Sequence, residues 1–305
     1  MIKRVISFSN PAYLSLDNAR ISVRKPEEDK PFAMLPVEDI GVVVIDHPRI
    51  TITAALLNSL LINNVAVITC TQNHLPIGMQ LPLDGNTLQS ERYKFQIDAS
   101  LPLKKQLWQQ TVQIKIHNQA AVLQSHRGIE VGNMIAWSKS VKSGDPENLE
   151  ARAAVYYWKY LYPEFPHFSR KPDGESPNHL LNYGYAIVRA LVARALVASG
   201  LLPTLGIHHR NRYNAYCLAD DIMEPFRPYV DSAVVDIVKK YNGIKPLKLE
   251  DKGIKRDLLS IPVMDTIVDG KNRPLMNAVE VAAASLSQCF QGTRKKIVYP
   301  TIPLA

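Results

Sequence analysis

The sequence has few cysteines, and none of them form a motif. Cys70, Cys217 and Cys289 are scattered over 305 residues. Without a CxxC spacing or an even set, a thiolate zinc site and a disulfide framework are both disfavoured, as is usual in a reducing compartment. The first residues, MIKRVISFSNPAY, contain no apolar run of the kind found in a secretory signal peptide. We therefore expect a cytoplasmic protein.

A long uninterrupted apolar segment is also lacking. The most apolar stretch, LLNYGYAIVRALVARALVASGLL, is broken by Asn182, Arg189 and Arg194. Charged side chains at the centre of a bilayer are costly. The stretch is therefore expected to be a buried helix, and no membrane partner is predicted.

Acidic residues are outnumbered by basic ones. The chain has 36 Lys and Arg against 28 Asp and Glu, a net charge of +8, and 46% of its residues are hydrophobic. The hydrophobic fraction is ordinary for a protein with a real core. The basic excess favours a polyanionic partner, with nucleic acid ahead of a membrane surface.

The hydrophobic pattern changes near residue 90. Strands are predicted before it from alternating or continuous apolar runs: KRVISFS, YLSLD, ARISVRK, IGVVVID and VAVITC. Between the last two, TAALLNSLLINN predicts a short helix capped by Thr51 or Thr53. We predict an α+β fold, with a small β-rich domain over residues 1–90 and a larger all-α domain over residues 91–305.

The second domain contains several predicted helices and a loose tail. Helical spacing is present over 103–118, 146–163, 177–200 and 213–241, with Pro146 in a favoured first-turn position. The final residues, YPTIPLA, are expected to be loosely ordered.

Acidic residues gather on the helix over 213–241. Its buried face is defined by apolar residues at every fourth position: Leu218, Ile222, Phe226 and Val230. Asp220 or Asp221 lies three or four positions before Glu224, so their carboxylates can meet, at a cost in stability unless a cation lies between them. Pro225 predicts a bend at this point.

Two adjacent histidines, His208 and His209, precede these acids. Imidazole together with carboxylates makes a mixed nitrogen and oxygen site that suits Mn²⁺ or Mg²⁺. A solvated acidic helix face, with Arg227 as its counter-ion, remains an open alternative from this helix alone.

Glu150 is the best further ligand outside this stretch. Its helical neighbours at i+3, i+4 and i+7 are Ala153, Ala154 and Tyr157. A carboxylate on so apolar a face is costly unless it is paired or bound to a metal.

Several segments resemble a known family. GIHHRNRYNAYCLADDIMEPFRP, NLEARAAVYYWKYLYP and NHLLNYGYAIVRA resemble the catalytic core of the CRISPR-associated integrase and endonuclease family, which inserts new spacers during CRISPR adaptation. NPAYLSLDNARISVR, VEDIGVVVIDHPRITIT and LPLDGNTLQSER resemble the branch found in type II systems. The resemblance covers nearly the whole chain.

The resemblance implies a site and a reaction. Glu150, His209 and Glu224 are the implied catalytic residues and ligands of Mg²⁺ or Mn²⁺. Asp221 supports the site, and the role of His208 stays open because the family often has one histidine here. The 3′-hydroxyl of a DNA end attacks a phosphodiester of the CRISPR repeat, and the metal stabilises the charge that develops.

The resemblance also implies partners. The β-rich domain is expected to mediate dimerisation and partner docking, and the helical domain to bind metal and DNA. The implied partners are a second copy in a homodimer, double-stranded DNA (prespacer and CRISPR repeat) and a small dimeric adaptation subunit, with the RNA-guided effector nuclease as a further candidate. Arg210, Arg212 and Arg227, beside the metal motif, are expected to contact phosphates.

Two other functions remain open. The first is a general metal-dependent nuclease of branched DNA in repair. The second is a DNA-binding scaffold without catalysis, against which the presence of Glu150, His209 and Glu224 counts.

Overall fold

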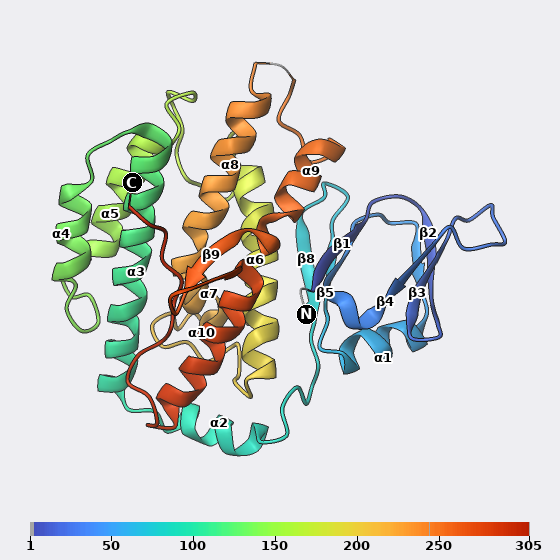
Figure 1. Cartoon of the computed structure of the whole chain (residues 1–305), viewed down its shortest axis with the longest axis horizontal. Helices are drawn as coiled ribbons and strands as arrows, with labels where there is room; N and C mark the ends of the chain where they lie inside the picture. Colours follow the sequence, from blue (N-terminus) through green and yellow to red (C-terminus); the bar gives the residue numbers. More distant parts are fainter. Residues whose placement is uncertain (1–2, 244, 305) are drawn as a thin grey trace.

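The architecture divides into a strand-rich part and a helical part. The computed structural model describes residues 3–243 and 245–304 (Figure 1). Strands predominate up to Gln80, and helices follow from Gln89. In Figure 1 the strands of the N-terminal part lie on the right and most helices on the left, which confirms the predicted α+β class.

Two sheets make up the N-terminal part. The first has the order β1-β5-β7-β8, in which β1, β5 and β7 are parallel and β8 is antiparallel to β7. The second has the order β4-β3-β2-β6, with β6 parallel to β2 and the other pairs antiparallel. The strands are β1 (Arg4–Phe8), β2 (Ala12–Asp17), β3 (Arg20–Arg24), β4 (Ala33–Pro36), β5 (Ile40–Ile45), β6 (Ile50–Ile52), β7 (Ala66–Cys70) and β8 (Pro76–Gln80). The short helix α1 (Ala54–Ile62) is capped by Thr53, whose hydroxyl accepts from the N–H of Leu56.

The central strand β5 belongs to two hydrophobic cores. Val42 and Val44 contribute to the core of the helical part, whereas Val43 lies in the core between the two sheets. Alternate residues of a strand face opposite sides of a sheet, so both sides of β5 are covered. This explains why its sequence is continuously apolar, as predicted for a strand buried on both faces.

The helical part is built around two long helices, α3 and α6. Its elements are α2 (Gln89–Ile97), α3 (Leu101–Arg127), α4 (Gly132–Ser140), α5 (Leu149–Leu161), α6 (Asn178–Ala198), α7 (Cys217–Met223), η2 (Glu224–Phe226), α8 (Arg227–Tyr241), α9 (Lys252–Leu259), the hairpin β9 (Asp265–Val268) and β10 (Lys271–Pro274), and α10 (Leu275–Phe290). In the described part of the chain, α6 is the helix long and apolar enough to cross a membrane, but 83% of its most apolar window is buried inside the protein. The prediction of a buried core helix is confirmed.

Two helix starts differ from the sequence predictions. The helix expected from Pro146 begins at Leu149, because the carboxylate of Asp145 accepts the N–H groups of Leu149 and Glu150 at 3.0 Å each. The helix expected over 213–241 begins at Cys217 and is interrupted by a 3₁₀ turn, η2, so the bend at Pro225 is confirmed.

The C-terminal tail is ordered, contrary to expectation. Tyr299 is buried and its hydroxyl lies 2.9 Å from that of Thr111 on α3. Asn118, also on α3, donates to the carbonyl of Pro300 and accepts from the N–H of Ile302. The tail is therefore fastened to the helix by partners far away in the sequence.

A buried ion pair joins the two parts of the molecule. Asp46, at the end of β5, is 1% exposed and lies 2.5 Å from Nζ of Lys255 on α9. His74 Nδ1 is 2.9 Å from the other carboxylate oxygen, and Ser9 contributes a longer hydrogen bond. Removing one member of such a pair leaves a buried charge without compensation.

Replacing Asp46 should destabilise the whole chain. We expect Asp46→Ala to lower the free energy of unfolding by about 3–5 kcal/mol, because Lys255 then remains buried and unpaired. Urea unfolding monitored by circular dichroism measures the change. Glu28→Ala breaks an exposed pair with Lys25 and serves as the control, with an expected change within about 0.5 kcal/mol. Equal effects of the two variants would contradict a joining role for Asp46.

Candidate active site

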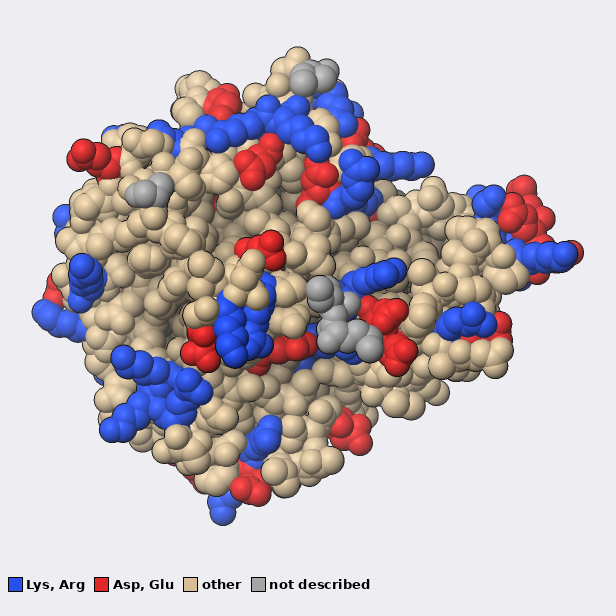
Figure 2. Space-filling model, in the orientation of Figure 1, with Lys and Arg blue, Asp and Glu red and all other residues tan. Residues whose placement is uncertain are grey.

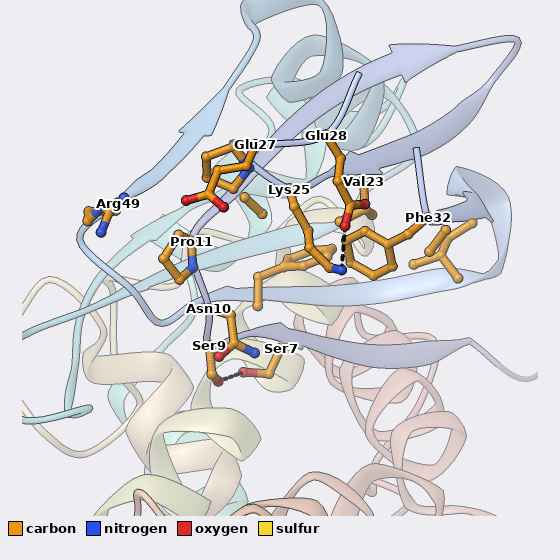
Figure 3. Close-up of a pocket in the computed structure, with 15 residues that line it drawn as sticks. Ser7, Ser9, Asn10, Pro11, Val23, Lys25, Glu27, Glu28, Phe32 and Arg49 are labelled. Carbon is orange, nitrogen blue, oxygen red and sulfur yellow. Dashed lines mark hydrogen bonds and ion pairs between the residues drawn. The ribbon is translucent and has the colours of Figure 1, made fainter. Parts of the chain in front are cut away.

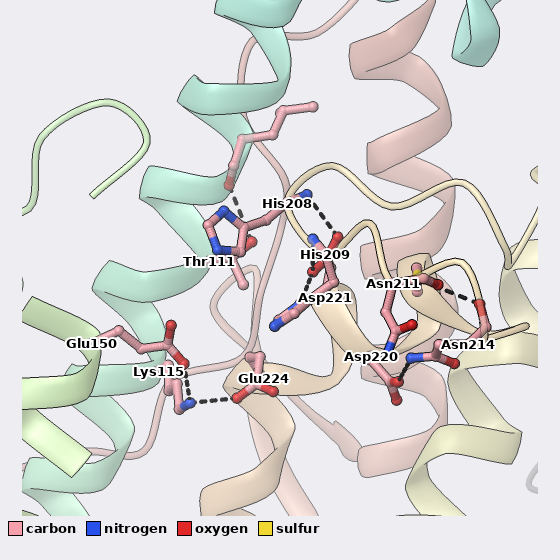
Figure 4. Close-up of polar contacts among 12 residues, drawn as sticks. Thr111, Lys115, Glu150, His208, His209, Asn211, Asn214, Asp220, Asp221 and Glu224 are labelled. Atoms are coloured by element: carbon pink, nitrogen blue, oxygen red, sulfur yellow. Dashed lines mark hydrogen bonds and ion pairs between the residues drawn. The ribbon is translucent and has the colours of Figure 1, made fainter. Parts of the chain in front are cut away.

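Three separate elements bring charged side chains to one place in the helical part (Figure 4). Lys115 comes from the middle of α3, Glu150 from the first turn of α5 and Glu224 from η2. The ammonium of Lys115 lies 2.5 Å from Glu150 Oε1 and 2.5 Å from Glu224 Oε2. The two predicted glutamates therefore meet around a single cation.

Backbone contacts fix where the two glutamates emerge. Asp145 caps the start of α5, which places Glu150 in the first turn. Asn118 on α3 donates to the carbonyl of Pro225 at 2.8 Å, and this bond holds η2, with Glu224, against α3. The geometry thus depends on capping and on one buried amide as well as on side-chain packing.

The charges of the cluster stabilise one another. Burial raises the pKa of Glu224, but Arg227 and Lys115 outweigh it and hold that pKa at about 2. Burial lowers the pKa of Lys115, yet Glu224 and Glu150 raise it above its ordinary value. Arg227 Nε donates to Glu224 Oε1 at 2.8 Å. The contacts of Glu224 with Lys115 and Arg227 are therefore ionic at neutral pH.

His209 is oriented by Asp221. The fully buried Asp221 accepts the backbone N–H groups of His208 and His209 at 2.9 and 3.2 Å, and lies 2.5 Å from His209 Nδ1. Because an ionised carboxylate can only accept, Nδ1 carries the hydrogen, and in the neutral ring Nε2 keeps its lone pair. A Cβ at Gly206 would lie 2.4 Å from the carbonyl oxygen of His209, so this turn requires glycine.

The two histidines have different surroundings. The ring of His208 stacks on Trp108 with centroids 4.1 Å apart and planes 3° apart. Burial lowers the pKa of His208, whereas the hydrogen bond to Asp221 raises that of His209. His209 is therefore the histidine held by a carboxylate, and His208 is packed against an aromatic side chain.

The three arginines expected at DNA are not equivalent. Arg210 and Arg212 are exposed in the loop before α7, where Arg212 lies 4.7 Å from the centre of the Tyr213 ring. With Lys104 they line a cavity of about 460 Å³ that also reaches His209. Arg227, in contrast, is bound to Glu224 and stacks on the ring of Tyr185 at 4.6 Å.

Lys115 is the member of the site that the sequence predictions omit. It lies four residues after Thr111, among the buried residues of α3, and its side chain is 11% exposed. A lysine on such a face requires anionic partners. The need for anionic partners can be inferred from the sequence, but the sequence does not identify which carboxylates contact the lysine.

The donor set suits a hard divalent cation. Two carboxylates already surround one cation, and Glu224 Oε2 faces Lys115 as an ion pair without the directed geometry of a hydrogen bond. His209 Nε2 adds a nitrogen donor. As the side chains stand, no three His, Cys, Asp or Glu residues among those described converge on one point. Lys115 takes the place between the two glutamates.

Other features of the surface are less suited to chemistry. A larger cavity of about 960 Å³ lies in the N-terminal part (Figure 3), where the acid Glu28 is paired with the exposed Lys25. On the face shown in Figure 2, Lys and Arg form several separate groups with acids between some of them. The acid–histidine cluster around Lys115 is therefore the stronger candidate for an active site.

Comparisons with known proteins identify the family of the chain. The family model for CRISPR associated protein Cas1 matches residues 5–247. A protein named CRISPR-associated endonuclease Cas1, from Neisseria meningitidis serogroup C (strain 8013), is 38% identical over 266 residues, covering 85% of this chain and 83% of the relative. A solved casposase bound to integration product superposes with a TM-score of 0.79 at 21% identity, covering 97% of this chain and 92% of that chain. A chain of a Cas6-RT-Cas1--Cas2 complex gives 0.73 at 21% identity, covering 96% of this chain and 35% of that chain.

The structural matches define a Cas1-type fold, in which a strand-rich N-terminal part precedes a helical part. The chain belongs to the CRISPR associated protein Cas1 family, a family of endonucleases and integrases. The resemblance seen in the sequence is thereby confirmed.

The pKa of His209 should depend on Asp221. We expect Asp221→Asn to lower it, because the hydrogen bond to the carboxylate is the main cause of its elevation. A raised pKa stabilises the folded protein fully below the ordinary value of about 6.5, and this contribution is lost as pH rises through the folded value. Asp221→Asn should therefore destabilise the protein more at pH 6 than at pH 8. NMR titration of the histidine ring protons, assigned with His208→Ala, measures the shift; an unchanged His209 would refute the pairing.

Proposed function

We propose that this chain is a metal-dependent DNA integrase of CRISPR adaptation, which joins the 3′-hydroxyl ends of DNA fragments to the repeat of a CRISPR array. The observation that carries the proposal is the meeting of Glu150 and Glu224 around one cation, beside a histidine whose free nitrogen is fixed by Asp221. Family membership supports it at the coarser level of an endonuclease and integrase.

Glu150, Glu224 and His209 Nε2 are the residues that would hold Mg²⁺ or Mn²⁺. When bound, the ion would stabilise negative charge on the phosphate oxygens and promote ionisation of the attacking hydroxyl. Asp221 keeps the imidazole in the required tautomer, and Arg227 keeps Glu224 ionised.

The reaction needs no nucleophile from the protein. The 3′-hydroxyl of the incoming DNA attacks a phosphorus atom of the repeat strand, one P–O ester bond forms and another breaks, and a new 3′-hydroxyl leaves. The number of phosphodiesters is unchanged, so the step requires no external energy source. What the chain must supply is orientation, charge stabilisation and a place for the backbone of DNA.

The proposal includes partners. Arg210, Arg212 and Lys104, around the cavity beside His209, would attract the phosphates of double-stranded DNA, both prespacer and repeat. We assign dimerisation and docking of a small dimeric adaptation subunit to the N-terminal part. A neighbouring solved structure is a Cas6-RT-Cas1--Cas2 complex, which supports an assembly of this kind. The RNA-guided effector nuclease is a further proposed partner, and the setting is cytoplasmic.

A second function uses the same residues. Water in place of the 3′-hydroxyl would make the chain a hydrolytic nuclease of branched DNA. The exposed loop with Arg210 and Arg212 would serve either substrate. The two functions differ in their product, because joined strands appear in one case and shortened strands in the other.

Loss of His209 should abolish strand joining. His209→Ala removes a ligand that is half-exposed and not part of the core, so we expect a loss of about 10³-fold, equivalent to several kcal/mol, with little change in melting temperature. Joining of labelled oligonucleotides into a plasmid that carries a repeat measures the activity. His208→Ala, which removes a ring stacked on Trp108, is the matched control and should be milder. The reverse order of severity would show that the wrong histidine was assigned.

Glu224 needs a more conservative test. Glu224→Ala would leave Lys115 and Arg227 buried without their anion, so folding would also change. Glu224→Gln removes the same charge but keeps the volume and one acceptor oxygen, so we expect it to be less destabilising than Glu224→Ala and to abolish joining as His209→Ala does.

DNA affinity should fall steeply with salt. Arg210→Ala with Arg212→Ala should weaken binding and reduce the slope of log affinity against log salt by about 2, if each arginine contacts one phosphate. Fluorescence anisotropy with a labelled duplex between low and moderate salt measures the slope. Lys139→Ala with Lys271→Ala removes the same charge from α4 and β10 and should leave the slope nearly unchanged. Equal slopes for both double variants would place the DNA elsewhere.

A further inference from the structure

Lys115 occupies an unusual position in the site. Its ammonium contacts both Glu150 and Glu224, at 2.5 Å from each, and Figure 4 shows it between them. Its side chain is only 11% exposed. A cation at this point is where a divalent ion shared by the two carboxylates would also have to lie.

We propose that Lys115 is a resident cation of the metal-free site, which a divalent ion displaces, and that its ammonium then pairs with a phosphate oxygen of bound DNA. The inference rests on the proposed function, because it assumes that Glu150 and Glu224 are metal ligands. It assigns to Lys115 the role of a positioning residue that couples metal binding to DNA binding.

The charges in the site favour displacement of Lys115 by a divalent ion over the presence of both cations together. Two carboxylates, Glu150 and Glu224, are balanced by two cations, Lys115 and Arg227. A divalent ion added without any movement would leave a double positive excess in a poorly solvated place, where like charges a few ångströms apart repel strongly. Removal of one resident cation relieves most of this repulsion.

Lys115 is the cation able to leave. Arg227 bonds Glu224 Oε1 at 2.8 Å and stacks on Tyr185, so its planar group is held on two sides. Lys115 instead ends in a compact charge on a flexible stem. Since Lys115 meets Oε2 and Arg227 meets Oε1, the lysine can withdraw while the arginine keeps Glu224 in place.

The movement is confined to the side chain. The backbone of α3 is fastened on both sides of Lys115: the hydroxyl of Thr111 bonds Tyr299, and Asn118 bonds the carbonyls of Pro225 and Pro300. A displaced ammonium therefore stays within the length of its own stem, close to the site. It requires a new anion there, and a phosphate of DNA provides one.

Coupling of this kind is reciprocal. If DNA gives the displaced ammonium a partner, then DNA raises the affinity for the metal, and the metal raises the affinity for DNA by the same factor. Competition from Lys115 would keep the affinity of the site for a divalent ion low until DNA is bound.

The test measures metal binding without turnover. Mn²⁺ is titrated calorimetrically into the full chain and into Lys115→Gln, with and without a duplex whose 3′ ends are dideoxy-blocked. We expect Lys115→Gln to bind Mn²⁺ at least about tenfold more tightly than the wild type in the absence of DNA, because the competing charge is gone. The duplex should raise the affinity of the wild type and leave that of the variant nearly unchanged.

Lys115→Arg is the matched control, because it keeps the charge and should bind Mn²⁺ no more tightly than the wild type. Thermal unfolding gives a second readout: without metal Lys115→Gln should melt below the wild type, and Mn²⁺ should raise its melting temperature by more. Lys115→Met replaces Lys115→Gln if the latter does not fold.

The outcomes separate the two proposals. If the wild type binds Mn²⁺ and joins DNA, but loss of the lysine charge leaves Mn²⁺ affinity equal or weaker, Lys115 is a fixed support and the displacement inference is wrong. If joining proceeds without any divalent ion and none of the proteins binds Mn²⁺, the metal assignment fails and the inference fails with it.

Discussion

Two glutamates carried into a poorly solvated place must be neutralised, and much of the helical part serves that requirement. A buried carboxylate is costly unless it is paired. Glu150 and Glu224 come from different elements, so their pairing with Lys115 also joins α3, α5 and η2. The capping carboxylate of Asp145 fixes the start of α5, and the amide of Asn118 holds η2 against α3. The contacts that neutralise the two glutamates are therefore also contacts that hold the helical part together.

The residues of the site that are close in sequence could be predicted as a group, whereas the contacts between distant elements could not. His209, Asp221 and Glu224 lie within one short segment, where helical spacing already limits their geometry. Glu150 is predicted as a member because its helical neighbours are apolar, and the fold places it against Lys115. Lys115 has its partners on other elements, and the buried stripe of α3 indicated only that some anion must face it. Arg227 is expected at DNA because it lies beside the metal motif, whereas in the fold its partner is Glu224, as in the alternative that makes it the counter-ion of the acidic helix.

The same holds for the fold: features set by nearby residues could be predicted, and features set by partners far away in the sequence could not. Alternation and apolar runs identified the strands, and Pro225 correctly marked the break before α8. The predicted helix start at Pro146 was wrong, because propensity favoured proline while two backbone N–H groups that donate to the carboxylate of Asp145 decided the boundary. The tail with Tyr299 and Pro300 has loop-like composition, and its order comes from Thr111 and Asn118, which no local pattern connects to it.

The division of β5 between two cores limits how this chain can be recombined with its relatives. Val43 packs with one set of neighbours and Val42 and Val44 with another, and α6 lies against β5, β7 and β8. A chimera cut at the obvious linker near residue 85 would pair a sheet from one parent with a helix from the other, and mismatched volumes in a close-packed interior are costly. Grafts that transfer β5, β7 and α6 as a set keep that interface intact. The linker near residue 85 therefore separates strands from helices, but a segment that can be exchanged between relatives must include elements from both sides of it.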